Sequence, residues 1–499
     1  MNELHLLSGP EGSIHHWLHK VNLCFVPGQN SPLLERFTDD LLAVFHQMGN
    51  TIQPAPDEHT DLILTTAPFG ESIPWREALL FTGRRRFKLD HIPTVITLMH
   101  ARPAEFQEWM DYFGTALRKE PIDPADFSFP DLASTAHRTL IEQGLRGGPI
   151  LSLERLLQSQ SKSIRILLIV GEDRPREVYH FDLVGAYPRS EAAQAGSFFQ
   201  DVVLRILTAL STQEVTQHQV VGEPLPASTW NRLTSPADLR IAGQELGRRG
   251  FFTEMVRIAD LVHVPALDAA IASQYSEGCF ATWEPQIGAL LATITGSARP
   301  VDKQDITQDE LAVIVGVRPD GKGALVRSVD GKRNDPPSSE AVEMFALDRR
   351  LPRITLDLSD HGQVLKRQVP VARSKLHGHR GVSSFHPGLV EFVPLDPAYY
   401  AYPVSCATEA QAQGIEQAFA GAEALNHPAD PRLVVFTILP GHGVVMVEKW
   451  KAGKAPFQVI WEFMDQGILT IDSRVPQGAL SYKPRPADPD HCWLFEPGG

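Results

Sequence analysis

Short apolar stretches alternate with longer amphipathic ones through about the first 120 residues of the chain. The stretches NLCFVPG, DLILTTAPFG and PTVITLMHA have the length and β-branched content of buried strands. Between the first two, LLERFTDDLLAVFHQMG repeats its apolar residues at helical spacing. Such alternation is typical of an open parallel sheet covered by helices. No GxGxxG motif occupies the strand-to-helix turns, so the pattern alone does not imply a dinucleotide.

The rest of the chain divides into two further parts. The proline-spaced segment KEPIDPADFSFPDLAS is interpreted as a connection, after which IRILLIVGED predicts a buried strand and a renewed α/β pattern. From about residue 350 onward, β-branched and aromatic residues cluster between turns. We therefore predict two Rossmann-like α/β domains, residues 1–133 and 134–264, followed by a domain at residues 265–499 with an antiparallel β-barrel-like sheet.

The charge, the cysteines and the apolar runs of the chain limit the partners and the compartment that we expect. The chain has 46 basic and 60 acidic residues, a net charge of −14, which argues against a broad surface for nucleic acids or anionic membranes. Its four cysteines form no CxxC pair or zinc spacing, which favours a reducing compartment. The N-terminus lacks a signal-peptide pattern, and no apolar run approaches the ~20 residues that span a bilayer. We expect a cytoplasmic protein with neither nucleic-acid nor membrane partners.

Two carboxylates, Glu284 and Asp305, flank a run of small and apolar residues. Apolar positions recur there at helical spacing, which predicts a buried helix between the two carboxylates. A carboxylate beside such a packed element is costly unless a cation or hydrogen bonds compensate it, so the pattern indicates a metal or sugar site. The alternative is that Glu284 caps this helix and Asp305 caps a following one, DITQDELAVIV, with Asp309 or Glu310 completing the turn.

Histidines gather in the last third of the chain. His377 and His379 form an H-x-H pair that can hold a metal on a strand but is also ordinary in a glycine-containing loop. His442 lies between two glycines after a strong strand candidate, where its ring can project from a turn. One imidazole and two carboxylates suit Mn²⁺ or Mg²⁺ better than a thiolate-binding metal. Such an ion can bind two adjacent oxygens of an open-chain sugar and assist proton transfer through an enediol.

The segment ATWEPQIGALLATITGSARPVDKQD resembles the metal-site segment of the L-fucose isomerase and L-arabinose isomerase superfamily. In that family a metal-binding glutamate precedes a small-residue helix, a TG turn and an acidic ligand, places that Glu284 and Asp305 occupy here. The later GHGVV, residues 441–445, is similar to the segment that supplies the histidine ligand of L-fucose isomerase, which here is His442. The resemblance implies two α/β domains, a C-terminal β-barrel-like part and a homo-oligomer, a trimer or hexamer.

We thus expect a divalent-metal-dependent aldose–ketose isomerase-like enzyme acting on a sugar or polyol-like substrate. Glu284 and Asp305 would be both ligands of Mn²⁺ and proton shuttles, and His442 the third ligand. Trp283 could stack on the sugar and His379 could contact it, although a tryptophan there also suits a core. The alternatives are a non-catalytic sugar-binding or regulatory protein on the same fold, and a metal-dependent hydrolase or lyase.

Overall fold

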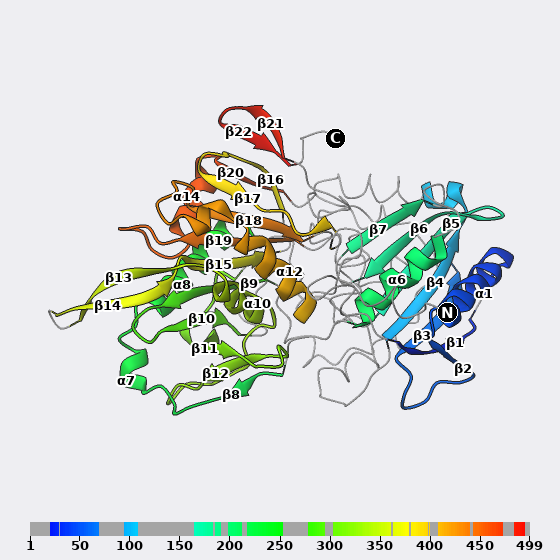
Figure 1. Ribbon diagram of the computed structural model, residues 1–499, viewed down its shortest axis with the longest axis horizontal. Coiled ribbons are helices and arrows are strands. Elements are labelled where there is room, and N and C mark those ends of the chain that lie inside the picture. Colours follow the sequence, from blue (N-terminus) through cyan, green and yellow to red (C-terminus); the bar gives the residue numbers. More distant parts are fainter. Residues whose placement is uncertain are drawn as a thin grey trace, which may run out of the picture. The chain divides into compact units, whose positions relative to one another are not determined.

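The chain forms two compact units, each built from separate stretches of sequence (Figure 1). Unit 1 comprises Met1–Thr212, Ile258–Gln274 and Ala401–Ser405, and unit 2 comprises Gln213–Arg257, Tyr275–Tyr400 and Cys406–Gly499. The computed structural model describes residues 20–28, 30–68, 94–107, 164–182, 185–190, 198–211, 217–252, 278–294, 303–360, 363–378, 381–397, 399, 408–439, 443–472 and 484–494. Both predicted domain boundaries, 133/134 and 264/265, lie outside these residues.

Unit 1 is organised around a seven-stranded sheet of order β2-β1-β3-β4-β5-β6-β7. The first five of these strands in the sheet are parallel, and β6 and β7 add an antiparallel edge. The predicted α/β character is therefore confirmed for this part of the chain. The described elements are β1 (Asn22–Val26), α1 (Pro32–Gln47), β2 (Thr51–Gln53), β3 (Leu62–Pro68), β4 (Thr94–Ala101), β5 (Ile164–Gly171), β6 (Pro175–Asp182), β7 (Gly185–Ser190) and α6 (Phe198–Ser211).

Helix α1 shows how the local sequence sets the core of unit 1. Ser31 caps the helix by accepting a hydrogen bond from the Leu34 N–H at 3.2 Å, and a proline follows in the first turn, where no donor is lost. The apolar residues at helical spacing are buried against the sheet and α6. The rings of Phe37 and Phe198 pack edge to face, with 6.4 Å between their centroids. Strand β5, expected to start a second domain, instead pairs in parallel with β4 and continues this sheet.

Unit 2 is organised around a nine-stranded mixed sheet of order β17-β18-β19-β15-β9-β10-β11-β12-β8. Most neighbours are antiparallel, but the two edge strands, β17 and β8, pair in parallel. Within the described residues this sheet is open, so the predicted barrel-like closure is absent from that part of the chain. The strands are β8 (Gln219–Val220), β9 (Cys279–Glu284), β10 (Ala289–Thr293), β11 (Leu311–Val317), β12 (Ala324–Arg327), β15 (Ala372–Gly378), β17 (Val390–Phe392), β18 (Val434–Leu439) and β19 (Gly443–Lys449).

Smaller elements surround that sheet. A four-stranded sheet has the order β20-β16-β22-β21, and β13 and β14 form a separate hairpin. These strands are β13 (Arg353–Asp360), β14 (Gln363–Pro370), β16 (Gly381–Phe385), β20 (Leu469–Asp472), β21 (Arg485–Asp488) and β22 (His491–Trp493). The helices are α7 (Ala227–Trp230), α8 (Ser235–Arg248), η5 (Gln308–Glu310), α10 (Glu340–Ala346), η6 (Leu347–Arg349), α12 (Glu409–Ala420), α13 (Glu423–Asn426) and α14 (Gln458–Asp465). None of the described helices is long and apolar enough to cross a bilayer.

The prediction of a helix between Glu284 and Asp305 is wrong. Strands β9 and β10 form an antiparallel hairpin here, with Glu284 opposite Ala289 and a turn in which Gly288 has φ +61°. Every residue of both strands is buried, because the sheet is covered on both faces. The sequence of a strand buried on both faces is a continuous run of apolar residues, and such a run includes apolar residues at helical spacing by chance.

Alternate residues of β9 serve the two covered faces of the sheet. Cys279, Ala281 and Trp283 belong to the cluster that α10 covers. Phe280 points the other way and contacts Phe252 and Phe457, close to α8 and α14. These two layers exclude water from both sides of the central strands, so charged groups there need partners within the protein.

One such pair joins β15 to η6 on the α10 face. The Lys375 ammonium lies 2.5 Å from a carboxylate oxygen of Asp348, and both side chains are buried. Burial lowers the pKa of Lys375 and raises that of Asp348, while each charge counteracts the shift of the other. The second oxygen of Asp348, Oδ1, has no hydrogen-bond partner in the described part of the chain.

Removing one partner of this pair is expected to destabilise unit 2 strongly. Lys375→Met leaves a buried carboxylate uncompensated, and the free energy of unfolding should fall by about 3 to 5 kcal/mol. The double variant Lys375→Met/Asp348→Leu removes both charges and should recover most of that loss. Urea unfolding followed by tryptophan fluorescence measures both. A double variant no more stable than the single one would show that the ion pair is not the source of the effect.

Candidate functional site

The three central strands β9, β15 and β19 define two ends of the nine-stranded sheet. At one end His377 pairs with Cys279, and Gly378 with Val444. We call this the Gly378 end. At the other end, the Glu284 end, Glu284 closes the β9–β10 hairpin and Ala372 pairs with Lys449. The predicted site residues divide between these two ends.

The Gly378 end adjoins both of the predicted histidines in sequence. His379 and His442 themselves lie outside the described residues. Gly378 ends β15 and Gly443 begins β19, and the pairing of these antiparallel strands brings the two glycines together. His377 is buried at the same end, with Nδ1 3.1 Å from the carbonyl oxygen of Val444, so Nδ1 is the ring nitrogen that donates.

Asp305 also lies toward the Gly378 end. Thr293 at the end of β10 pairs with Leu311 at the start of β11, which places the preceding turn there. The Asp305 side chain is exposed. The alternative role of Asp305 as a helix cap is not what the structure shows, because Thr307 is the capping residue of η5 and Glu310 completes a capping box, its Oε2 accepting from the Thr307 N–H at 2.9 Å. DITQDELAVIV therefore forms one short turn and strand β11 rather than a helix.

Buried polar groups collect beside this turn. Lys303 is fully buried and has a left-handed backbone, φ +60°. The charges of Lys303 and Glu340 both act on the Cys279 thiol. Ser338 donates its N–H to the carbonyl of Thr293 at 3.0 Å and its hydroxyl to the Glu340 carboxylate. No sequence pattern pointed to this group, although the segments TGSARPVDK and PPSSE contain most of its members.

Cys279 is not a reactive thiol in this setting. Burial raises its pKa to about 12, and the nearby charge of Glu340 adds to that effect. Lys303 and hydrogen bonds from Thr293 and Ser338 oppose it without reversing it. The thiol therefore stays protonated at neutral pH, which argues against a role as a thiolate nucleophile.

Glu284 lies apart from these groups. It lies four positions from Phe280 along an extended strand, about 13 Å at about 3.3 Å per residue. Glu284 is 2% exposed, and its carboxylate accepts the Gln286 N–H at 2.9 Å within its own turn. Trp283 points to the opposite face, where its buried ring contacts Phe345 at 6.2 Å and the Arg353 guanidinium at 5.6 Å. The structure thus places Trp283 in a core and Glu284 in a buried turn.

A guanidinium explains how Glu284 is tolerated there. Arg373 occupies the irregular position in the β15–β19 ladder, and its charge interacts with those of Glu448, Asp238 and Glu284. Its Nη1 donates to the carbonyl of Lys454 at 2.6 Å, and the guanidinium stacks 4.8 Å from the Trp450 ring. Three carboxylates thus surround one guanidinium. Arg373 therefore compensates their buried negative charge and does not form an open anion site.

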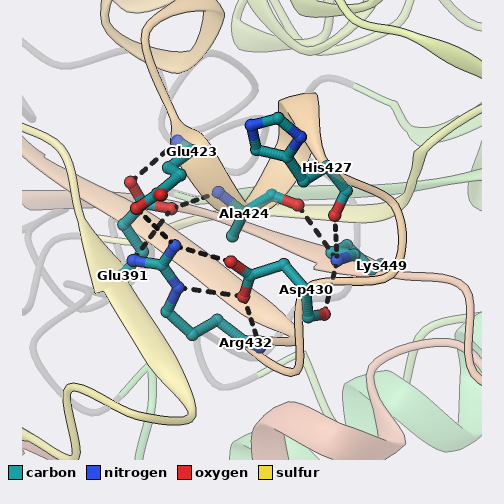
Figure 2. A network of polar contacts seen from close by, with 7 residues as sticks. All are labelled: Glu391, Glu423, Ala424, His427, Asp430, Arg432 and Lys449. Atoms are coloured by element: carbon teal, nitrogen blue, oxygen red, sulfur yellow. Dashed lines mark hydrogen bonds and ion pairs between the residues drawn. The ribbon is translucent and has the colours of Figure 1, made fainter.

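Lys449 and Arg432 organise another polar network, shown in Figure 2. The Lys449 ammonium donates to three backbone carbonyls, those of Ala424 at 3.0 Å, His427 at 3.3 Å and Asp430 at 2.9 Å. Arg432 binds the Asp430 and Glu423 carboxylates at 2.7 and 2.8 Å. The ammonium satisfies the carbonyls that a bound cation would otherwise use, so this network fixes the loop before β18 against β19 and leaves no place for an ion.

No group of three or more histidine, cysteine, aspartate or glutamate side chains suited to a metal occurs among the described residues. Because His379 and His442 fall outside that set, the predicted ligand set of Glu284, Asp305 and His442 stays a prediction. In the described structure Asp305 and the sequence neighbours of both histidines lie toward the Gly378 end of the sheet, whereas Glu284 lies at the opposite end.

Glu448 gives the Glu284 end a measurable pH dependence. Its carboxylate accepts N–H bonds from Phe457, Val459 and Ile460 at 2.8, 2.9 and 3.2 Å, which favour the charged form. Burial outweighs them and raises its pKa to about 7 from an ordinary 4.5. A carboxyl with a raised pKa in the folded state binds its proton more tightly there, so its stabilising contribution is full below pH 4.5 and is lost as the pH rises through 7.

We expect the free energy of unfolding of the wild type to fall, relative to that of Glu448→Gln, by up to about 3 kcal/mol between pH 4.5 and 7. Urea titrations at several pH values measure this difference. Glu462→Gln, on the adjoining helix, is the matched control. The pKa of Glu462 is lowered, chiefly by its hydrogen bond from Lys454, so it should show no such loss in that window. A wild-type to Glu448→Gln difference that is independent of pH would contradict the assignment.

Comparisons of the chain with protein-family models, with curated proteins and with solved structures found no match.

Proposed function

We propose that the chain is a divalent-metal-dependent aldose–ketose isomerase-like enzyme whose site lies at the Gly378 end of the nine-stranded sheet. The supporting observation is the register that brings Gly378, Gly443 and the turn bearing Asp305 toward the same end. His379 and His442 adjoin those two glycines in sequence. One exposed carboxylate with imidazoles is a donor set that suits Mn²⁺ and leaves positions for substrate oxygens.

In this proposal Asp305 and His442 hold the metal, and His379 contacts the substrate. A bound Mn²⁺ would polarise two adjacent oxygens of an open-chain sugar. The Asp305 carboxylate would take the proton from the carbon beside the carbonyl and return it to the former carbonyl carbon, while the proton of the adjacent hydroxyl passes to the former carbonyl oxygen. The polar groups behind the turn, the buried Lys303 and the half-buried Glu340 among them, would keep its backbone in place. Glu284 is left out of the set because about 13 Å of strand separates it from this end.

A second candidate function is a non-catalytic sugar-binding protein on the same fold. In that case the same end of the sheet would bind polyol hydroxyls through side chains alone. The two functions differ in whether a metal is bound at all, so one measurement separates them.

The test is the manganese content of the full chain, stripped with EDTA and reloaded with Mn²⁺, measured by elemental mass spectrometry. We expect one Mn²⁺ in the wild type, its loss in Asp305→Asn and His442→Ala, and its retention in Glu284→Gln, which keeps the acceptor for the Gln286 N–H. Isomerisation of a panel of aldoses and ketoses should follow the same pattern, with no turnover by Asp305→Asn.

Each other outcome removes part of the proposal. A wild type that binds no Mn²⁺ would exclude the isomerase and leave the sugar-binding protein. Loss of metal in Glu284→Gln, with an unchanged circular dichroism spectrum, would move the site to the Glu284 end. Stoichiometric Mn²⁺ without isomerisation of any sugar tested would separate the metal site from the proposed reaction.

A further inference from the structure

Strands β13 and β14 form an unusually independent part of unit 2. Their eight consecutive antiparallel pairs contain no bulge and no shift of register. In the described part of the chain neither strand pairs with a third, so both outer edges of this hairpin are free of ladder hydrogen bonds. Figure 1 shows the hairpin extending outward from the rest of unit 2.

Only the base of the hairpin is supported by the body of unit 2. Ile354 and Leu356 pack on the core cluster beneath α10, to which the buried Val369 also belongs. Farther out, Leu358 and Leu365 face each other half-buried, and Val364 is 66% exposed. A two-stranded hairpin is marginally stable by itself in water, and a long regular edge is a template for pairing with another strand.

We propose that β13 pairs with β13 of a second copy of this chain, joining two hairpins into one four-stranded sheet across a two-fold axis. Length supports this occupant. An eight-residue edge needs a partner edge of similar length, and the other outer strands of unit 2, β8, β17, β20 and β21, have two to four residues. The hairpin of a second copy supplies an edge that matches in full.

The register of this pairing follows from which side chains share a face. The two hairpins present one continuous apolar face only if a residue of β13 lies opposite its own copy or opposite one an even number of positions away. Centring the axis on Leu356 sets Leu356 against Leu356 and Ile354 against Leu358 of the second copy. Centring it on Asp357 instead would oppose two carboxylates, which is unfavourable.

Charges favour β13 over β14 as the contact edge. With the axis at Leu356, Arg353 lies diagonally across from Asp357 of the second copy. The Arg353 guanidinium donates to the Gln368 carbonyl at 2.7 Å and lies 5.6 Å from the Trp283 ring centroid, so it attracts that carboxylate as a nearby charge. On β14 the central residues are Lys366 and Arg367, so a two-fold axis at either one opposes like charges. Pro370 also removes a backbone donor from β14.

The experiment compares Asp357→Lys with Lys366→Asp by sedimentation velocity of the full chain. These two residues are cross-strand partners within one hairpin, so each substitution creates one like-charged pair there and they are matched in that respect. We expect the wild type to be a dimer or a higher even-numbered oligomer. Asp357→Lys should weaken the β13 contact at least tenfold, and Lys366→Asp should leave it unchanged. Circular dichroism checks that both variants are folded.

Three results would overturn the proposal. They are a wild type that stays monomeric at micromolar concentration, an Asp357→Lys variant with wild-type association, and a greater loss of association in Lys366→Asp than in Asp357→Lys. The last result would place the contact on β14. Metal content and turnover do not enter the readout, so the outcome is independent of the proposed function.

Discussion

The pairing of β15 between β9 and β19 is the constraint on which the rest of unit 2 depends. These strands are more than 60 residues apart in sequence, and their register determines which side chains reach each face and each end of the sheet. It places His377 beside Cys279 and sends Lys375 toward η6 on one face and Glu448 toward α14 on the other. Once both faces are covered, every charge on these strands must find a partner inside the protein.

The buried charges of unit 2 show three solutions to that requirement. Lys375 is paired with a single carboxylate, Lys449 donates to three backbone carbonyls, and Glu448 accepts from the N–H groups that begin α14. In each case the charged group joins a strand to a short helix or a loop. Burying charge is costly, so these contacts specify where the loops and short helices lie more than they add to stability.

Local sequence patterns predicted local structure well and long-range pairing poorly. The helical spacing of the apolar residues was sufficient to predict α1. The β9–β10 hairpin was mistaken for a helix because a strand buried on both faces has no alternation to reveal it. The pairing of β4 with β5 spans more than 60 residues, and no local pattern records it.

The sequence indicates the chemistry of the candidate site but not where its residues lie, for the same reason. Asp305, His379 and His442 were chosen for their chemistry, and the register brings Asp305 and the neighbours of the two histidines toward one end of the sheet. Glu284 met the same chemical criteria but lies at the far end of its strand, a distance that spacing in sequence does not reveal. Lys303 and Ser338 escaped notice because a buried lysine and a serine carry no signal until their neighbours are known.

The pairing of β4 with β5 also bears on how the chain folds. Strand β4 ends at Ala101 and β5 begins at Ile164, so the seven-stranded sheet cannot be completed until a long intervening segment has been synthesised. Unit 1 further includes Ile258–Gln274 and Ala401–Ser405, which emerge from the ribosome much later. Contacts of such long range are slow to form. The early strands therefore expose an unpaired parallel edge until β5 has been made. The folding yield of this chain should then depend on protection of that edge during synthesis.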